Sequence, residues 1–352
     1  MRGQRKGDVM RPSSRWVLSV FAVALGVALG LTVGAGDAQV KNQLTAKKVA
    51  GAPSLDGAMD ASWQGAVPMT VKVLGGRGLQ NGSTEVSVRA VYTADTVYFL
   101  MQYKDETNSI RREPWQKQAD GSWKKLGDPS DKGGDNNLYY EDKWAMIWNV
   151  SSPTFEQRGC FSACHTGEGK PFGNKYTPNP GERLDMWHMK GVRTGTVDQV
   201  DDQYVDNTRY DKDKAPEAGR KSDPNTGGGY TNNVSDDKKS PKFALPGNKP
   251  APPFWIMGSE KEPFDDSKYK TGDEVPGIIV APYTGDRGDI SAKIVYKDGV
   301  RTSVFWRKLV TGSEYDVQFG DLKKEYAFGV AVFDNAQVRH AYSPGVLKMK
   351  FE

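Results

Sequence analysis

Short segments in which apolar and polar side chains alternate are the feature of this sequence that most limits its fold. Val86 to Tyr92 and Val97 to Tyr103 alternate on either side of the tight connection at Ala94-Asp95. Alternation with a period of two on both sides of a short loop predicts a β-hairpin. Trp144, Met146, Trp148 and Val150 predict a further strand of the same kind.

The C-terminal part repeats this pattern. The segments 290–296 and 300–309 flank Asp298-Gly299, a dipeptide that favours a hairpin turn. Segments 326–333 and 346–351 add two more strands. Many short strands with turn signals and few helical windows predict an all-β fold, an antiparallel β-sandwich.

The middle of the chain differs from both ends. Residues 151–272 are rich in Gly, Pro, Asn, Asp and Lys, and the stretch 206–253 is especially polar. Such a segment buries little apolar surface and favours long loops. We therefore predict a mostly irregular insertion at about 151–272, with one short helix from Glu182 to Val192 that places Trp187 and His188 on one face.

The first residues indicate the compartment. Five Lys/Arg residues precede an apolar stretch from Trp16 to Val33, and small residues follow up to Ala38. This order is typical of a secretory signal peptide, here residues 1–38, and predicts a periplasmic or otherwise exported protein. An uncleaved membrane anchor is the alternative. No later stretch is apolar enough to span a bilayer, so we expect no integral membrane segment after cleavage.

Charge and cysteine content exclude two classes of protein. The predicted signal carries five Lys/Arg and two Asp, so removing its net +3 from the chain's +4 leaves about +1. No basic face stands out, which argues against nucleic-acid binding. The only two cysteines are four positions apart, so the chain is no disulfide scaffold. Residues 39–352 are expected to form a single domain.

The segment Gly159-Cys-Phe-Ser-Ala-Cys-His165 carries the most distinctive chemistry. A Cys-His ending is typical of covalent haem attachment, in which Cys160 and Cys164 bond to the haem vinyl groups and His165 is the proximal iron ligand. The spacer here has three residues in place of the usual two. A local disulfide is one alternative, and a zinc site is another that lacks ligands, since the chain has three histidines.

A low-spin electron carrier needs a second axial ligand. His188, in Asp185-Met-Trp-His-Met-Lys190, is the leading candidate, with Met186 and Met189 as competitors. His340 is a weaker candidate. The pair Asp201-Asp202 is of the kind that binds calcium, but no EF-hand pattern is present. No catalytic triad, phosphate loop or dinucleotide fingerprint is visible, so we expect an electron-transfer protein and not an enzyme.

Four segments together resemble the haem-binding family of the ethylbenzene dehydrogenase gamma subunit and dimethyl sulfide dehydrogenase-type subunits. They are Leu55 to Trp63, Val88 to Thr107, the Gly159 to Gly167 segment with Asp185 to Lys190 and Asp201-Asp202, and Ile290 to Asp334. The opening Asp-Gly…Asp…Trp is shared with family 9 carbohydrate-binding modules. A carbohydrate-binding sandwich without haem is therefore the alternative function.

The resemblance implies a β-sandwich with haem at one end that serves a periplasmic molybdenum enzyme of the dimethyl sulfoxide reductase class. It assigns one covalent haem c to Cys160 and Cys164, proximal ligation to His165 and distal ligation to His188. Members without cysteines hold haem b through methionine and lysine. Met101 and Lys293 are the positions to examine for a second haem, and the number of haems, one or two, stays open.

Overall fold

The computed structural model describes residues 42–131, 134–163 and 175–352. Residues 39–352 form one compact unit. The predicted signal peptide, Cys164 and His165 lie outside the described residues. No helix in the described ranges is long and apolar enough to cross a membrane.

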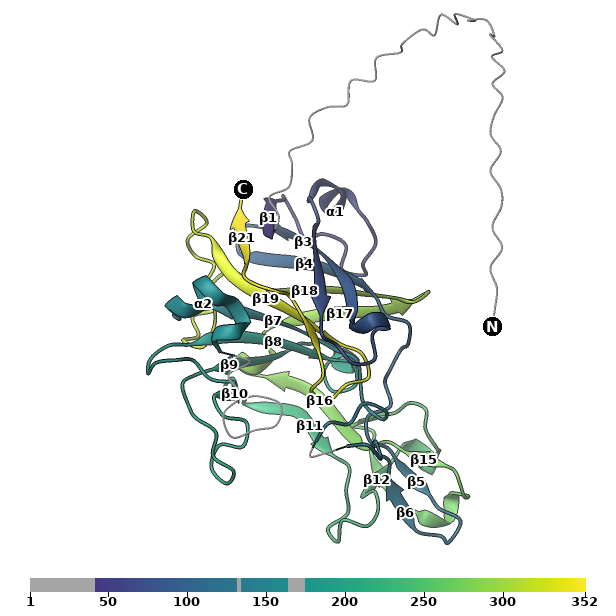
Figure 1. Ribbon diagram of the computed structural model, residues 1–352. Coiled ribbons are helices and arrows are strands. Elements are labelled where there is room, and N and C mark those ends of the chain that lie inside the picture. Colours follow the sequence, from purple (N-terminus) through teal and green to yellow (C-terminus); the bar gives the residue numbers. More distant parts are fainter. Residues whose placement is uncertain (1–41, 132–133, 164–174) are drawn as a thin grey trace, which may run out of the picture. The chain divides into compact units, whose positions relative to one another are not determined.

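The all-β prediction is confirmed: a 13-stranded sheet folds over itself into a β-sandwich (Figure 1). One layer runs in the order β2 (Met69–Leu74), β3 (Ser83–Tyr92), β4 (Thr96–Lys104), β18 (Val300–Lys308) and β17 (Ser291–Lys297). The other runs β10 (Arg220–Ser222), β9 (Asp201–Val205), β8 (Leu184–Lys190), β7 (Lys143–Asn149) and β19 (Tyr326–Phe333). Neighbouring strands within each layer are antiparallel.

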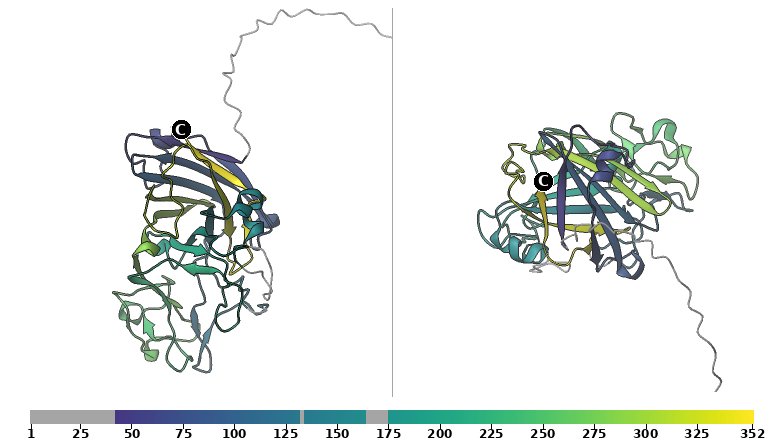
Figure 2. Two further views of the ribbon diagram at one scale, coloured as in Figure 1. Left: turned by 90° about the vertical axis from the view of Figure 1, so that its left-hand side faces the viewer. Right: turned by 90° about the horizontal axis from the view of Figure 1, so that it is seen from above.

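Two bridges join the layers. One passes from β19 through β20 (Ala341–Tyr342) to β2, and the other from β19 through β21 (Leu347–Phe351) and β1 (Gln43–Lys48) to β3. Strand β1 is parallel to both of its neighbours. The view from above in Figure 2 shows β1 and β21 lying across this edge of the sandwich.

The core between the layers is apolar and rich in aromatic rings. Trp144, Met146 and Trp148 of β7 point into it, as alternation predicted. They meet Phe99 of β4 and Phe305 of β18, whose rings stack at 5.1 Å. Because side chains alternate along a strand, the opposite side of β7 is left to face outward.

The remaining strands form three small sheets. They are β11 (Gly227–Asn232) with β16 (Ile278–Thr284) and β13 (Ile256–Met257), β12 (Phe243–Ala244) with β14 (Glu262–Pro263), and β15 (Glu274–Val275) with β5 (Trp115–Lys117) and β6 (Trp123–Lys125). The helices are short: α1 (Ala61–Gly65), α2 (Pro153–Arg158) and the 3-10 turns η1 (Gln80–Gly82), η2 (Gly159–Ser162), η3 (Gly195–Val197), η4 (Pro246–Asn248), η5 (Asp266–Lys268) and η6 (Asp286–Gly288).

One predicted element is wrong. The segment from Glu182 to Val192 is not a helix: Leu184–Lys190 is strand β8, paired with β7 and β9. Pairing with a strand on each side supplies the backbone hydrogen bonds that a helix would have supplied internally. Part of the predicted insertion is thus regular, since β8, β9 and β10 extend the main sheet.

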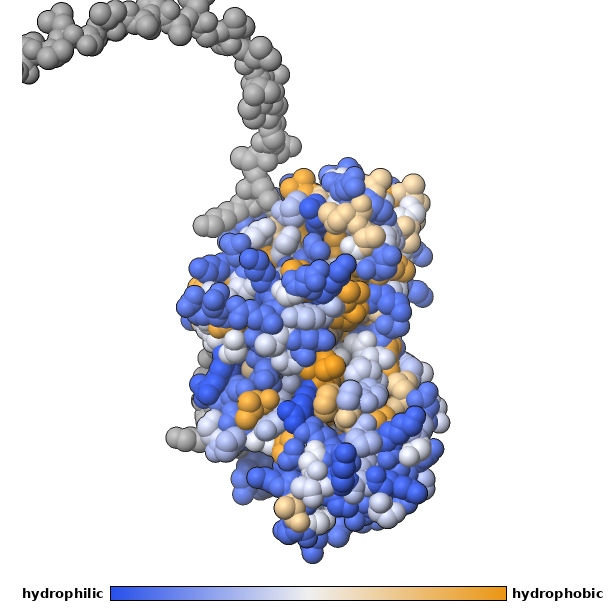
Figure 3. All heavy atoms as spheres, turned by 90° about the vertical axis from the view of Figure 1, so that its right-hand side faces the viewer, coloured by the Kyte–Doolittle hydropathy of each residue, from blue (hydrophilic) through white to orange (hydrophobic). Residues whose placement is uncertain are grey.

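The face drawn in Figure 3 is mostly covered by hydrophilic side chains, with small separate apolar patches between them. Scattered apolar residues of this kind are ordinary on a water-exposed surface.

Candidate functional site

A pocket of about 420 Å³ lies on the outward side of β7, β8 and β19. Its floor consists of Ala145 and Ile147 from β7 with Gly329 and Ala331 from β19. These residues alternate with the core-facing tryptophans and phenylalanines of the same strands. Because most of the floor side chains are small, the sheet surface is hollowed here.

Strand register places the ligand candidates beside this floor. His188 of β8 is opposite Ala145, which is itself opposite Ala331. One row further, Met186 is opposite Ile147, and Ile147 is opposite Gly329. His188 and Met186 therefore share the pocket, whereas Met189 and Trp187 point into the core on the other side of β8.

His188 is held in a tautomer in which Nε2 can bind a metal ion. Its Nδ1 lies 3.3 Å from Oε1 of Gln203, and the same Oε1 accepts a hydrogen bond of 3.3 Å from Nη1 of Arg220. Since Oε1 is an acceptor, Nδ1 must carry the ring proton. Nε2 is then an unprotonated nitrogen, and this buried atom has no hydrogen-bond partner within the described structure.

Burial keeps His188 neutral. The residue is only 8% exposed. Burial, followed by the nearby charge of Lys190 and Lys143, holds the pKa of His188 well below its usual value. A neutral imidazole with one nitrogen fixed by a neighbour and the other bare is the arrangement of a metal-ligating histidine.

Cys160 reaches the same pocket from a different segment. It lies in η2, directly after α2, and is 92% buried in a small cluster with Ile147 and Met186. Its Sγ lies against β19 so closely that a Cβ on Gly329 would be 2.7 Å away. Of the four predicted site residues, Cys160 and His188 thus share one pocket, and the structure does not describe the other two.

Cations dominate the pocket wall. The charged residues that line it are Arg112, Lys143, Lys175, Lys190, Arg193, Arg220 and Glu217. Some have carboxylate partners: Lys190 pairs with Asp201, Arg193 with Glu141, and Arg220 with Glu217. Lys143, 98% buried, instead donates to the backbone oxygen of Gln337 at 2.8 Å. Burial, followed by the charge of Arg193, holds the pKa of Lys143 well below its usual value.

His340, the weaker ligand candidate of the sequence, lines this pocket as well. Its ring lies 4.6 Å from that of Phe333, whose other neighbours include His188 at 5.7 Å. Its Nδ1 lies 3.0 Å from the backbone oxygen of Val338. Strand β20 pairs with the end of β19, and this pairing returns His340 to the outer face. The sequence around His340 contains no pattern that predicts this pairing.

The residues considered for a second haem are not together. Met101 is buried in the core between the layers. Lys293 is half-exposed on β17, and its Nζ pairs with Asp198. Strands β4 and β17 are separated by β18.

The fold and the pocket define a β-sandwich protein with a histidine-bearing, cation-lined pocket on one outer face. The chain belongs to the family described as ethylbenzene dehydrogenase, whose model matches residues 60–344. No curated protein matches the sequence.

Among solved structures, the chain is similar to a family 9 carbohydrate-binding module from Caldicellulosiruptor kristjanssonii. In the complex with glucose the identity is 8% and the TM-score 0.31; in the complex with cellotriose they are 11% and 0.32. Each match covers 88% of this chain and 94% of the other.

Proposed function

We propose that this protein is an exported electron-transfer protein that carries one haem c in the outer-face pocket. Cys160 and Cys164 would hold the haem covalently, and His165 and His188 would be the axial ligands of its iron. The observation that carries the proposal is the buried Nε2 of His188, which lacks a hydrogen-bond partner in the described structure. A buried polar atom without a partner costs about 1–3 kcal/mol, and an iron ligand bond would remove that cost.

The remaining pocket residues suit a haem group. The small floor residues Ala145, Gly329 and Ala331 leave room beside His188. The thioether position, Cys160, lies within the same wall. Haem carries two carboxylates, and the arginines of the wall can pair with them.

The chain's own residues then determine the redox behaviour. Haem supplies reversible uptake of one electron. Gln203 fixes the His188 ring, and burial of the pocket limits water around it. The surplus of cations favours the more negatively charged, reduced state of the site and raises its reduction potential. We find no residue set in the described structure that suggests catalysis.

Family membership supports a role beside an oxidoreductase. We propose as partner a molybdenum enzyme of the dimethyl sulfoxide reductase class, in the periplasm, as the predicted signal peptide implies.

The carbohydrate-binding alternative has little support from Trp63, the aromatic residue of the shared motif. Trp63 is fully buried, and its Nε1 donates to the backbone oxygen of Ser54 at 2.9 Å. Asp60 caps α1 by accepting from the Trp63 backbone N–H. The motif therefore stabilises a turn, and its tryptophan is not available as a sugar platform.

A denaturing gel stained for haem peroxidase activity tests covalent attachment. Protein made in a host that attaches haem c should give a stained band, and the double variant Cys160→Ser/Cys164→Ser should give none. A visible spectrum of that double variant then shows whether the pocket still takes haem without covalent bonds. An unstained wild-type band with no haem spectrum in the native protein would refute the proposal and favour the carbohydrate-binding alternative.

A further inference from the structure

A cluster of five aspartates lies at the far side of β8 and β9 from the haem pocket. Its members are Asp185 of β8, Asp202 of β9, Asp223, Asp289 and Asp316. Four of the five are at least 97% buried, the exception being the partly buried Asp289. Carboxylate oxygens of Asp185, Asp202 and Asp316 lie within 4.8 Å of one another.

One guanidinium faces these carboxylates. Nη1 of Arg307 lies 3.1 Å from Asp185, 3.4 Å from Asp202 and 3.3 Å from Asp316. Its Nη2 donates instead to the backbone oxygen of Val317. Five carboxylates against one cation leave four negative charges in a buried space if all are ionised. Burial of unbalanced charge on this scale is too costly for a folded protein.

The second observation is that the cluster's oxygens lack partners. Both carboxylate oxygens of Asp223 are buried without a hydrogen-bond partner in the described structure. The same holds for one oxygen each of Asp185, Asp289 and Asp316. Asp223 lies close enough to Asp316 and Asp185 for their charges to act on it. Five oxygens of these four aspartates are thus buried without a hydrogen-bond partner in the described structure.

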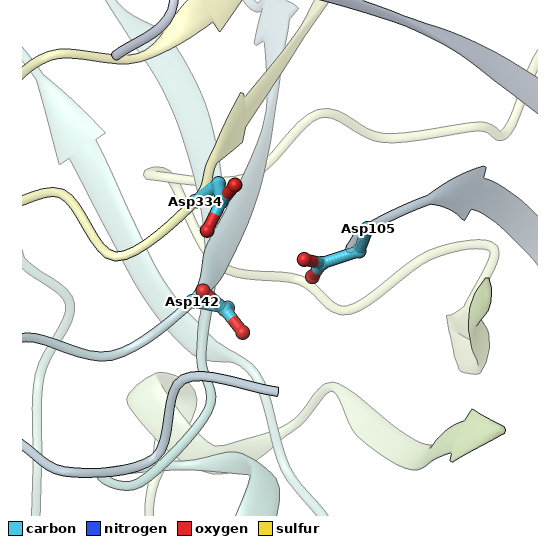
Figure 4. A group of neighbouring side chains, drawn as sticks. All are labelled: Asp105, Asp142 and Asp334. Carbon is cyan, nitrogen blue, oxygen red and sulfur yellow. The ribbon is translucent and has the colours of Figure 1, made fainter. Parts of the chain in front are cut away.

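In a second aspartate cluster, by contrast, the protein itself supplies hydrogen bonds and ion pairs to the carboxylates. Asp105, Asp142 and Asp334 point toward one another (Figure 4), and Arg301 pairs with Asp105 and Asp142. Asp142 accepts from the backbone N–H groups of Ser109 and Asn335. Asp105 accepts from Thr107 N–H and from Arg301, and Asp334 from the Thr107 hydroxyl. No carboxylate oxygen of these three is a buried atom without a partner.

We propose that Asp185, Asp202, Asp223, Asp289 and Asp316 form a buried binding site for one divalent cation, Ca²⁺. Calcium takes six to eight oxygen ligands and tolerates irregular geometry, which suits several carboxylates donated from separate segments. Magnesium demands a stricter octahedron and keeps more of its water, so it suits this dry site less well. Two positive charges added to Arg307 offset most of the negative charge.

The position of the site indicates a structural role for the cation, which is to link separate segments of the fold. Asp202 precedes Gln203, and the Gln203 backbone N–H donates to the Asp202 carboxylate at 3.0 Å. Asp185 accepts from Val317 N–H at 2.9 Å. A cation here would tie β8, β9 and the 316–317 segment together, immediately behind the strand that carries His188. The inference does not depend on haem.

Calorimetric titration of the EDTA-treated, desalted full-length protein with CaCl2 tests the site. We expect one Ca²⁺ per chain, a melting temperature that rises with Ca²⁺, and a smaller response to MgCl2. Asp223→Asn should weaken Ca²⁺ binding at least tenfold, because Asp223 supplies two of the bare oxygens and no ion pair to Arg307. Asp334→Asn, in the second cluster, is the matched control and should leave binding unchanged.

Several results would overturn the proposal. They are the absence of both binding heat and a thermal shift, binding that survives Asp223→Asn, or binding lost with Asp334→Asn alone. An equal response to MgCl2 would contradict the assignment to calcium. If Asp223→Asn does not fold, Asp289→Asn replaces it, since Asp289 is only partly buried. Unchanged affinity in that variant would count equally against the site.

Discussion

At the scale of single residues, the pocket depends on how His188 is held. Oε1 of Gln203 accepts a hydrogen bond from the Nδ1–H of His188, and it accepts a second one from Arg220. Such an acceptor makes the imidazole a stronger donor to a metal and fixes its orientation. The side chain of Gln203 is therefore expected to act as a positioning residue, with an effect on the reduction potential.

Replacing Gln203 tests this role in both directions. Gln203→Leu removes the acceptor, so His188 donates less to the iron, the oxidised state loses stabilisation, and the reduction potential rises. Gln203→Glu strengthens the acceptor and should lower the potential. A spectroelectrochemical titration of both variants measures the shifts. Equal potentials in wild type and both variants would mean that Gln203 does not act through the ligand.

Gly329 is a second residue whose size matters. A Cβ at this position would lie 2.7 Å from Sγ of Cys160, a distance that forces one of them to move. We expect Gly329→Ala to cost about 1–3 kcal/mol in the free energy of unfolding and to lower the fraction of protein with attached haem. Urea unfolding and the haem-to-protein absorbance ratio measure these effects.

The control for that variant is Gly127→Ala, because a Cβ there would meet nothing within 4 Å. Comparable losses of unfolding free energy and of attached haem in both variants would show that the contact with Cys160 is not the cause.

At the scale of elements, sequence patterns predicted the sandwich well. The hairpin around Asp298-Gly299 forms as predicted, with positive φ at both residues, and joins β17 to β18. Trp144, Met146 and Trp148 face the core as alternation indicated. These strands follow a period of two over several residues, so a short stretch of sequence is enough to predict each one.

The site itself could be predicted only in part. In Leu184–Lys190 every residue is buried, because both faces of β8 are covered. Exposed and buried positions therefore do not alternate along this strand. The helical interpretation was wrong for that reason. The pocket also requires the register of β7, β8 and β19, which are distant in sequence, and no local pattern encodes such pairings.

Strand geometry predicts separate roles for two neighbours, Trp187 and His188. Trp187 is fully buried in the core, so Trp187→Ala should cost about 3–5 kcal/mol of unfolding free energy while the haem spectrum of the folded fraction stays unchanged. Urea unfolding followed by circular dichroism, together with visible spectra, measures both. Trp187→Phe is the milder companion variant. A changed spectrum with unaltered stability would contradict the assignment of Trp187 to the core.

At the scale of the whole molecule, one layer of the sandwich separates opposite charges. Cations line the outer pocket, and Asp185, Asp202 and Asp316 gather on the other side of β8 and β9. Burial, followed by the charges of its neighbours, raises the pKa of Asp223 to about 9. Asp289 and Asp185, raised mainly by burial, have pKa values of about 7 and about 6.

These shifts predict how stability depends on pH. The folded state holds protons on these carboxyls more tightly than the unfolded state, so stability falls as pH rises through the folded-state pKa values. In EDTA, wild type should lose up to about 2 kcal/mol relative to Asp223→Asn between pH 7 and 9, since asparagine does not titrate. Arg307 also faces the cluster, and the charge of Asp223 acts on the Tyr204 phenol.

Ca²⁺ should reduce this loss, because a bound cation favours the ionised carboxylates. Urea unfolding of both proteins at each pH, in EDTA and in CaCl2, provides the measurement. A wild type that gains stability over the variant as pH rises in EDTA would contradict the predicted shifts.

The most direct test of the account is the visible and electron paramagnetic resonance spectrum of His188→Ala beside His340→Ala. Both histidines line the pocket, but only His188 is assigned to the iron. We predict a low-spin, six-coordinate spectrum in wild type and in His340→Ala. His188→Ala should give a high-spin spectrum that returns to low-spin when imidazole is added. A low-spin spectrum that persists in His188→Ala without imidazole would contradict the assignment.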